Sequence, residues 1–207
     1  ARKPHYMKVG DKTIALVAVC EHEYSYALPN REGCWGFDPF DTMEDISIAA
    51  EKADCVIVMY HGGKEQCEYP SPRLMKLCRA MVKNGADVVL CQHSHCIGAY
   101  ENFEGAHILY GQGNYHFVKE SKHANWYTAF AVKYDTKSHE IEFIPLHMLE
   151  EGIELAKGEL AKSIMAGFKA RSASLLDGTW IEGWRAFNDA GSLCHGWSAL
   201  PAYYLKT

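Results

Sequence analysis

Short apolar runs, each about as long as a β-strand, recur through the first half of the chain and are separated by segments with helical periodicity. The runs span residues 13–20, 55–60, 87–91 and 107–113. They are nearly continuous in apolar residues rather than alternating, which is typical of parallel strands covered on both faces. This order of strand, helix and strand predicts an α/β fold in which helices flank a sheet.

Two helical segments carry start and stop signals. The first covers residues 41–53 and opens with Asp41 three residues before Glu44, the spacing of a capping box. In the second, Ser71 is the predicted N-cap, a proline follows it, and Gly85 ends the helix. The apolar positions of the second helix form one stripe, which predicts its buried face: Leu74, Leu77, Cys78, Met81 and Val82.

The second half of the chain changes character. Residues 126–135 and 140–148 are predicted to be two strands joined by the polar turn "TKSH". Beyond them, "EEGIELAKGELAKSIMAGFKARSASLL" and "TWIEGWRAFNDAG" have helical patterns and few chemically reactive groups. We therefore expect a first domain over residues 1–149 and a helical C-terminal appendage over residues 150–207.

Composition and charge exclude several classes of protein. Of 207 residues, 48% are hydrophobic and 23% are charged, which is globular rather than disordered composition. The formal net charge of -5 gives no reason to expect nucleic acid as a partner, because phosphate binding needs a basic face. No apolar run approaches the roughly 20 residues of a transmembrane helix. The first residues, "ARKPHYMKVGDK", lack an initiator Met and a signal-peptide pattern, so we expect a processed or truncated chain.

Eight cysteines raise the possibility of disulfides or structural zinc. Their spacing contains no Cys-x-x-Cys pair, which zinc modules commonly use, and several lie inside apolar runs. We expect mostly free, buried thiols. An isolated zinc site built from Cys91, His93, His95 and Cys96 is a poor alternative, because all four side chains would have to converge from one short strand end.

Histidines follow two of the predicted parallel strands. His61 comes directly after the strand at residues 55–60, and His93 and His95 follow the strand at residues 87–91. Because ligand sites gather at the carboxyl ends of strands in α/β sheets, these imidazoles should emerge at the same edge. A single histidine there would be an ordinary surface residue, whereas three converging histidines favour a metal site.

Three stretches of the chain, "VIVMYHGG", "EYPSPRLMKLCRAMVKNGADVVLCQHSHCIGAYENFEG" and "ILYGQGNYHF", together resemble one family. They are similar to CapA-type proteins, the poly-γ-glutamate capsule synthesis group of the calcineurin-like metallophosphoesterase superfamily. The resemblance covers roughly residues 13–117 in order and spacing. It implies the C-terminal portion of a metallophosphoesterase sandwich, with mixed sheets flanked by helices.

The resemblance also implies a set of site residues. It assigns His61, His93 and His95 as metal ligands, and it places Asn114 in the site as a catalytic or scaffolding residue. Gln92 stands where the family usually has a glycine. The implied chemistry is hydrolysis by two divalent cations about 3.5–4 Å apart, and mixed nitrogen and carboxylate ligands suit manganese, zinc or iron.

Carboxylate ligands are the missing part of this implied site. The Asp-x-His, Gly-Asp and Asn-His elements of the superfamily are expected upstream of the matched stretch, so the first half of the metal site is expected to be absent. Asp11 follows a glycine but falls in a predicted turn, and we interpret it as solvated. Glu21, His22 and Glu23 either bind metal or substrate or form a polar loop, and Glu65 either orients a histidine or is solvated.

Two functions from different classes fit these observations. The first is a metal-dependent hydrolase of bacterial capsule or exopolymer metabolism that acts on an anionic polymer or a phosphoester. The second is a non-catalytic envelope protein that binds or tethers an anionic polymer. The resemblance favours the bacterial cell envelope as the location, and oligomeric state and substrate stay open. With three imidazoles and no bridging carboxylate, we expect at most one tightly bound cation and weak activity for this chain alone.

Overall fold

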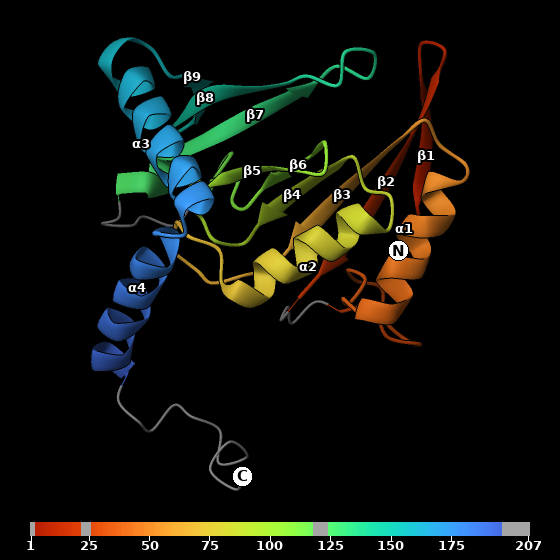
Figure 1. Cartoon of the computed structure of the whole chain (residues 1–207), viewed down its shortest axis with the longest axis horizontal. Helices are drawn as coiled ribbons and strands as arrows, with labels where there is room; N and C mark the ends of the chain where they lie inside the picture. The colour runs from red at the N-terminus through yellow and green to blue at the C-terminus, as the bar shows by residue number, and fades with distance from the viewer. Residues whose placement is uncertain (1–2, 22–25, 118–123, 196–207) are drawn as a thin grey trace, which may run out of the picture.

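A six-stranded sheet forms the centre of the protein. The computed structural model describes residues 3–21, 26–117 and 124–195. The strands lie in the order β1-β2-β3-β4-β6-β5 (Figure 1). Strands β2, β3, β4 and β6 are parallel, and β1 and β5 pair antiparallel at the two edges. The strand bounds are β1 His5–Val9, β2 Lys12–Cys20, β3 Cys55–His61, β4 Val88–Gln92, β5 Tyr100–Phe103 and β6 Ala106–Leu109.

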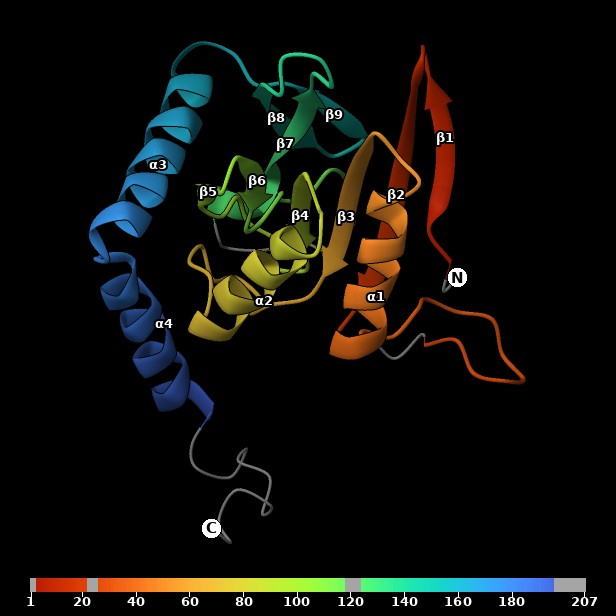
Figure 2. The same cartoon turned by 45° about the vertical axis from the view of Figure 1, so that its right-hand side comes forward.

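Helices α1 (Pro39–Ala50) and α2 (Pro72–Lys83) connect the parallel strands and cover one face of the sheet (Figure 2). The predicted start of α2 is confirmed, because the Ser71 hydroxyl accepts the Leu74 N–H at 3.0 Å. The predicted capping box at Asp41 is wrong. Asp38 is the N-cap instead, and its carboxylate accepts two N–H groups of the first turn. The reason is the proline at the next position, whose fixed φ favours a helix start there.

A three-stranded antiparallel sheet forms the second layer, in the order β7-β8-β9. Its strands are β7 Thr128–Tyr134, β8 Ile141–Leu149 and β9 Gly152–Leu155. The first two confirm the strands predicted there. The helix predicted to begin at residue 150 is wrong over its first turns, because these residues pair with β8 as β9. The β8–β9 hairpin crosses the expected boundary at residue 150, and the division into two domains stays a prediction.

Helices α3 (Gly158–Asp177) and α4 (Trp180–His195) follow β9 and lie along one end of the two sheets (Figure 1). They confirm the helical character predicted for this part of the chain. Gly178, with φ of 81°, separates them in the left-handed region that favours glycine. Within the described ranges, no helix is long and apolar enough to span a membrane.

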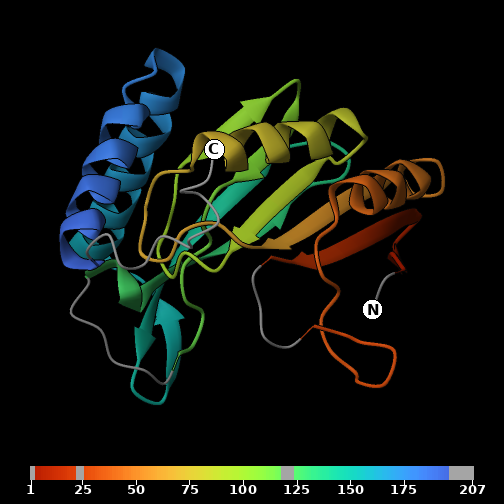
Figure 3. The ribbon, with the colours of Figure 1, turned by 90° about the horizontal axis from the view of Figure 1, so that it is seen from below.

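Alternate residues of the parallel strands point into two different cores. Val89 and Cys91 of β4 pack toward α1 and α2, whereas Leu90 between them packs on the opposite face. There it belongs to a second cluster that includes Phe130 of β7 and Phe168 of α3. Seen from below in Figure 3, α1 and α2 lie along one face of the first sheet. The second sheet and α3 pack on the other face. This arrangement confirms the predicted α/β sandwich of mixed sheets flanked by helices.

Candidate metal centre

The parallel register brings the ends of β2, β3 and β4 to one edge of the sheet. His61 pairs with Cys20 on one side and with Gln92 on the other. The backbone N–H of Glu21 donates to the His61 carbonyl at 2.7 Å, which joins the loop after β2 to the loop after β3. Gly62 is required here, since a Cβ would lie 2.8 Å from the Tyr60 ring and 2.9 Å from the Glu21 Cβ.

The loop after β4 holds its two histidines in an unusual backbone conformation. His93 has φ of 86° and His95 has φ of 57°, in the left-handed region that residues with a Cβ rarely adopt. The loop is fixed by the N–H of Gln66, which donates to the Ser94 carbonyl at 2.7 Å, and by the buried Ser94 hydroxyl, which donates to the Cys96 carbonyl. Such strain persists where the surroundings enforce it and is common at functional sites.

His61 and His93 face each other at this edge. Nε2 of His61 lies 3.2 Å from Nδ1 of His93, and the ring centroids are 5.1 Å apart. Two imidazole nitrogens bound to one tetrahedral cation at about 2.0–2.1 Å would be separated by about 3.3 Å. The spacing of this pair therefore fits two ligands of a single cation.

His95 has a different environment from this pair. Its ring centroid lies 6.2 Å from that of His93 and 4.7 Å from that of Trp126. Nδ1 of His95 lies 2.8 Å from Oδ1 of Asn114, whose Nδ2 donates to the Trp126 carbonyl at 2.9 Å. Because the amide oxygen is an acceptor, Nδ1 of His95 carries the proton and Nε2 keeps its lone pair. Asn114 therefore fixes the tautomer in which His95 can act as a ligand through Nε2.

Gly113 brings Asn114 into this position. Its φ is 83°, and a Cβ at this residue would lie 2.2 Å from the Thr128 carbonyl oxygen. The close approach lets the Asn114 N–H donate to the same carbonyl at 3.1 Å. Asn114 is buried, with 6% of its surface exposed. The glycine before Asn114 thus positions an amide side chain that was predicted from the sequence to line the site.

Carboxylates do not complete the ligand set among the described residues. In that part of the chain, no group of three or more His, Cys, Asp and Glu side chains is arranged to hold a metal ion. Glu65 is exposed on the loop after β3, and Glu23 lies outside the described residues. Asp11 is exposed in the β1–β2 turn, as expected. The structure thus places one ring nitrogen of His61 beside one of His93. The assignment of His61, His93 and His95 as ligands, and of Glu65 as an orienting group, stays a prediction.

The structure excludes the four-residue zinc site. Cys91 is fully buried on the helix side of β4, where its Sγ lies 3.6 Å from Sγ of Cys78 in α2. The seven cysteines with described side chains are free thiols, as expected, and the eighth, Cys194, falls outside that set. Gln92, the departure from the family pattern, stays in β4 and donates from Nε2 to Oε1 of Gln112 at 3.0 Å. The turn's conformational strain falls on the two histidines instead.

A carboxylate, a phenol and a guanidinium form a network beside His61. Glu21, with 8% of its surface exposed, accepts hydrogen bonds from the Tyr60 hydroxyl and from Nη1 of Arg73. Burial, together with the Glu21 carboxylate, raises the pKa of Tyr60 far above its usual range, so its hydroxyl stays protonated as a donor. Arg73 was missed in the sequence. The only signal was its place in "PSPRL", directly after the predicted helix start.

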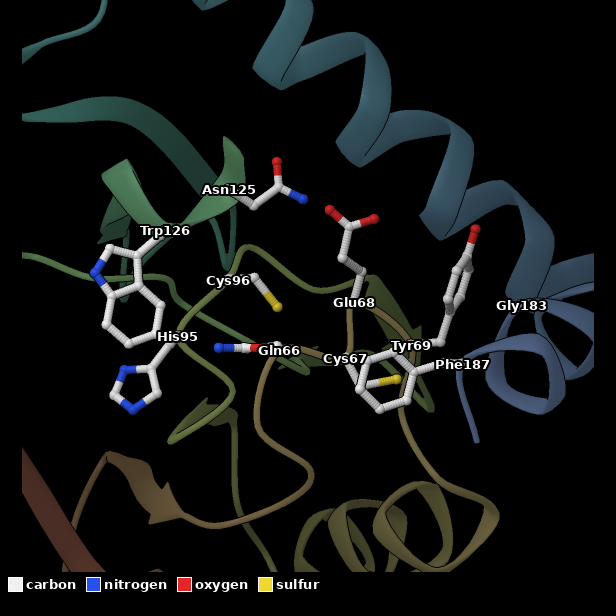
Figure 4. A pocket seen from close by; sticks show the side chains of 10 residues that line it. All are labelled: Gln66, Cys67, Glu68, Tyr69, His95, Cys96, Asn125, Trp126, Gly183 and Phe187. Carbon is white, nitrogen blue, oxygen red and sulfur yellow. The ribbon is translucent and has the colours of Figure 1, made fainter. Parts of the chain in front are cut away.

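A cavity of about 320 Å³ adjoins His95. In Figure 4, His95 and Trp126 line one side, Tyr69 and Phe187 line the opposite side, and the Glu68 carboxylate lies between these sides. Burial raises the pKa of the lining thiol Cys67 to about 11, so it is a neutral group and not a nucleophile at neutral pH. The cavity has room for one small-molecule group next to His95.

Comparison with known proteins identifies the family. The chain is 34% identical over 118 residues to the PGA biosynthesis protein CapA of Bacillus subtilis (strain 168), covering 56% of this chain and 31% of that protein. It is 30% identical over 118 residues to the capsule biosynthesis protein CapA of Bacillus anthracis, covering 54% of this chain and 29% of that protein. The chain thus spans less than a third of the length of these relatives. The family model for the bacterial capsule synthesis protein PGA_cap matches residues 1–119, more than half of the chain. The chain therefore belongs to this family.

Proposed function

We propose that this chain acts in bacterial capsule synthesis and carries part of the metal centre of a hydrolase, with His61 and His93 as ligands. The observation that carries the proposal is the 3.2 Å separation of their ring nitrogens at the carboxyl edge of the sheet. Membership of the capsule synthesis family supports the biological role. The expected substrate is a phosphoester or an anionic polymer such as poly-γ-glutamate.

Each residue of the site has a distinct task in this proposal. A manganese, zinc or iron ion, when bound, supplies a water of lowered pKa as the nucleophile. His61 and His93 hold the cation, and the strained loop keeps the imidazole of His93 directed at His61. Asn114 selects the tautomer of neutral His95 that has its proton on Nδ1, so that the Nε2 lone pair can ligate the cation or contact substrate. The cavity beside His95 accommodates one unit of the substrate.

The chain by itself holds at most one cation tightly. A binuclear centre needs bridging carboxylates, because imidazoles alone bind a second cation poorly. In a longer protein, comparable in length to the curated relatives, such carboxylates would come from residues outside the present sequence. We therefore expect weak or undetectable phosphodiesterase activity for the 207-residue chain and metal-dependent activity for the longer protein.

Metal stoichiometry tests this proposal. The purified chain is loaded with Zn²⁺ or Mn²⁺, excess metal is removed, and bound metal is measured by elemental analysis. We expect about one equivalent in the wild type and at least a tenfold weaker affinity in the double variant His61→Ala, His93→Ala. His107→Gln, at the opposite edge of the sheet, is the matched control and should bind as the wild type does. Equal binding by the double variant would reject the site, and two equivalents would show that a carboxylate contributes.

A second candidate is a non-catalytic protein that binds or tethers an anionic polymer. It is supported by the lack of a converging carboxylate among the described residues. Activity of the longer protein separates the two. If that protein is inert toward phosphate esters and γ-glutamyl polymers with either metal, yet binds the polymer in a salt-dependent way, the binding function replaces the hydrolase. In the hydrolase, His93→Ala should lower activity at least about a hundredfold.

A further inference from the structure

The cavity beside His95 has aromatic side chains on two opposite sides. His95 and Trp126 line one side (Figure 4). Their ring centroids are 4.7 Å apart, and Trp126 has only 4% of its surface exposed. Tyr69 and Phe187 line the other side. A ring-shaped group that enters the cavity would therefore contact aromatic side chains on both sides.

Helix α4 supplies part of the second aromatic side. Gly183 and Phe187 are four residues apart in α4, so they lie on the same face of that helix. A Cβ at Gly183 would lie 2.4 Å from the Tyr69 ring, so this glycine lets Tyr69 pack directly against the helix. Both α4 residues lie beyond residue 119, where the family match ends. The wall built by α4 is thus outside the part of the chain that the family model matches.

Two side-chain amides lie between the aromatic sides. Figure 4 shows those of Gln66 and Asn125 there. In the described part of the chain, neither amide group has a hydrogen-bond partner. Gln66 also has φ of 60°, in the left-handed region, and its backbone N–H donates to the Ser94 carbonyl, which fixes this loop against the loop after β4. The two amides can therefore donate hydrogen bonds to a ligand and accept them from it.

The charge of the cavity wall is balanced. Among the lining side chains that the structure describes, Glu68 is the one carboxylate, and there is no lysine or arginine. Nη1 of Arg171 lies 3.4 Å from Oε2 of Glu68, behind the cavity wall, and offsets its charge. An anionic unit such as a glutamyl carboxylate would therefore lack a cationic partner on the described wall. The lining favours an uncharged group that carries hydrogen-bonding atoms.

The cavity also lies close to the predicted cation site. His95 lines the cavity, and its ring centroid is 6.2 Å from that of His93. His93 in turn has Nδ1 3.2 Å from Nε2 of His61. A ligand that fills the cavity can therefore reach the histidine pair through a short link, such as a single ester bond.

We propose that the cavity binds the neutral sugar ring of a sugar phosphoester whose phosphoryl group lies at the His61–His93 pair. The faces of a sugar ring carry C–H groups that pack against aromatic rings, and its hydroxyl groups pair with side-chain amides. A cavity of about 320 Å³ has room for one such ring. The position of the phosphoryl group rests on the proposed function and selects the phosphoester from the two substrates named there. Sugar binding itself needs no metal.

Titration of the metal-free chain with N-acetylglucosamine tests the sugar site. Metal is removed with a chelator, and binding is followed by shifts of backbone amide resonances. We expect saturable binding by the wild type, at least about tenfold weaker binding by Phe187→Ala and about three- to tenfold weaker binding by Gln66→Ala. Phe40→Ala, at a phenylalanine of α1 with 84% of its surface exposed, is the matched control and should bind as the wild type does.

A conservative variant and a second probe separate recognition from folding. Phe187→Leu keeps an apolar side chain in α4 and loses the ring, so sugar affinity should fall while the midpoint of thermal unfolding stays near that of the wild type. A tri-γ-glutamate peptide should bind at least about tenfold more weakly than the sugar. No sugar binding by the wild type, tighter binding of the peptide, or unchanged sugar affinity in both Phe187 variants overturns the proposal.

Zinc loading separates the sugar site from the hydrolase. With Zn²⁺ bound, N-acetylglucosamine 1-phosphate should bind at least about tenfold more tightly than N-acetylglucosamine. The double variant His61→Ala, His93→Ala should lose this gain and keep its affinity for the neutral sugar. If the wild type binds the sugar without any gain from the phosphate, the position of the phosphoryl group is rejected together with the proposed metal centre, and the sugar site stands.

Discussion

Two groups of histidines lie at opposite edges of the central sheet, and their surroundings differ in kind. His107, the second residue of β6, is buried at the amino edge. Both of its ring nitrogens have neutral, fixed partners: the Tyr100 hydroxyl at 2.8 Å and the His139 carbonyl at 2.9 Å. At the carboxyl edge, His61 and His93 instead present ring nitrogens to each other. The backbone of His93 is strained, whereas that of His107 lies within a regular strand.

The difference shows how one residue type serves two purposes. Since Nε2 of His107 faces a carbonyl oxygen, this atom carries the proton and Nδ1 accepts from the Tyr100 hydroxyl. Every hydrogen-bonding capacity of that ring is used, so the ring stabilises the fold and has no lone pair for a ligand. Two facing imidazole nitrogens, in contrast, can share one proton or one cation. His107 at the amino edge therefore stabilises the fold, whereas His61 and His93 at the carboxyl edge are arranged so that they can bind a ligand.

The largest expected effect on stability follows from removing the His107 ring at the amino edge, together with its hydrogen bonds to Tyr100 and His139. His107→Ala removes a buried ring and leaves the Tyr100 hydroxyl and the His139 carbonyl without this partner. We expect the free energy of unfolding to fall by about 2–3 kcal/mol, while zinc affinity stays within twofold of the wild type. Urea denaturation measures the first quantity and calorimetry the second. His61→Ala should give the reverse pattern. If both variants lose stability equally, the comparison between the two edges fails.

A smaller effect is expected from relieving strain at the carboxyl edge. The left-handed conformation of His93 costs roughly 1–2 kcal/mol for a residue with a Cβ, and glycine avoids that cost. His93→Gly should therefore raise the free energy of unfolding by about 0.5–1 kcal/mol while weakening zinc binding at least tenfold.

Glu104 provides the control for this exchange of stability for binding. It has φ of 52° in the turn between β5 and β6, away from the histidine pair. Glu104→Gly should raise the free energy of unfolding by a similar amount and leave zinc affinity unchanged. A loss of stability in His93→Gly would mean that the imidazole contributes to the fold as His107 does.

The sequence was sufficient to predict the parallel strands and the edge at which the histidines meet. Continuous apolar runs marked β2, β3 and β4, and the residues directly after them had to share one edge once the strands were parallel. The contact between Glu21 and Arg73 was not predictable in this way, because it joins residues 52 positions apart through side chains alone. No pattern of hydrophobic positions reports such a pair.

Other errors arose where tertiary pairing overrode local pattern. Residues 152–155 carry a helical sequence pattern, but they follow a strand with an open edge and pair with it as β9. The structural role of His107 also had no local signal, because its partners come from β5 and from the turn before β8. Periodicity predicts which face of an element is buried, and it gives no information on the hydrogen bonds made there.

The smallest expected effect concerns His95, which shares features with both edges. Like His93 it has a positive φ, and like His107 it has one ring nitrogen fixed by a neutral partner, the Asn114 amide oxygen at 2.8 Å. Long-range ¹H–¹⁵N spectra of the imidazole nitrogens should show the proton of His95 on Nδ1 and that of His107 on Nε2. Asn114→Ala removes the acceptor, so His95 should populate both tautomers.

Zinc affinity in Asn114→Ala then decides to which group His95 belongs. If Nε2 of His95 is a third ligand, losing the orienting amide should weaken zinc binding by about tenfold, as for other groups that orient a ligand histidine. Asn125→Ala, an amide in the 3₁₀-helix η1 (Ala124–Tyr127) that lines the same cavity, is the matched control and should leave affinity within twofold of the wild type. A change of tautomer with unchanged zinc affinity would place His95 with His107, as a residue that supports the site through its contact with Trp126 and binds no cation.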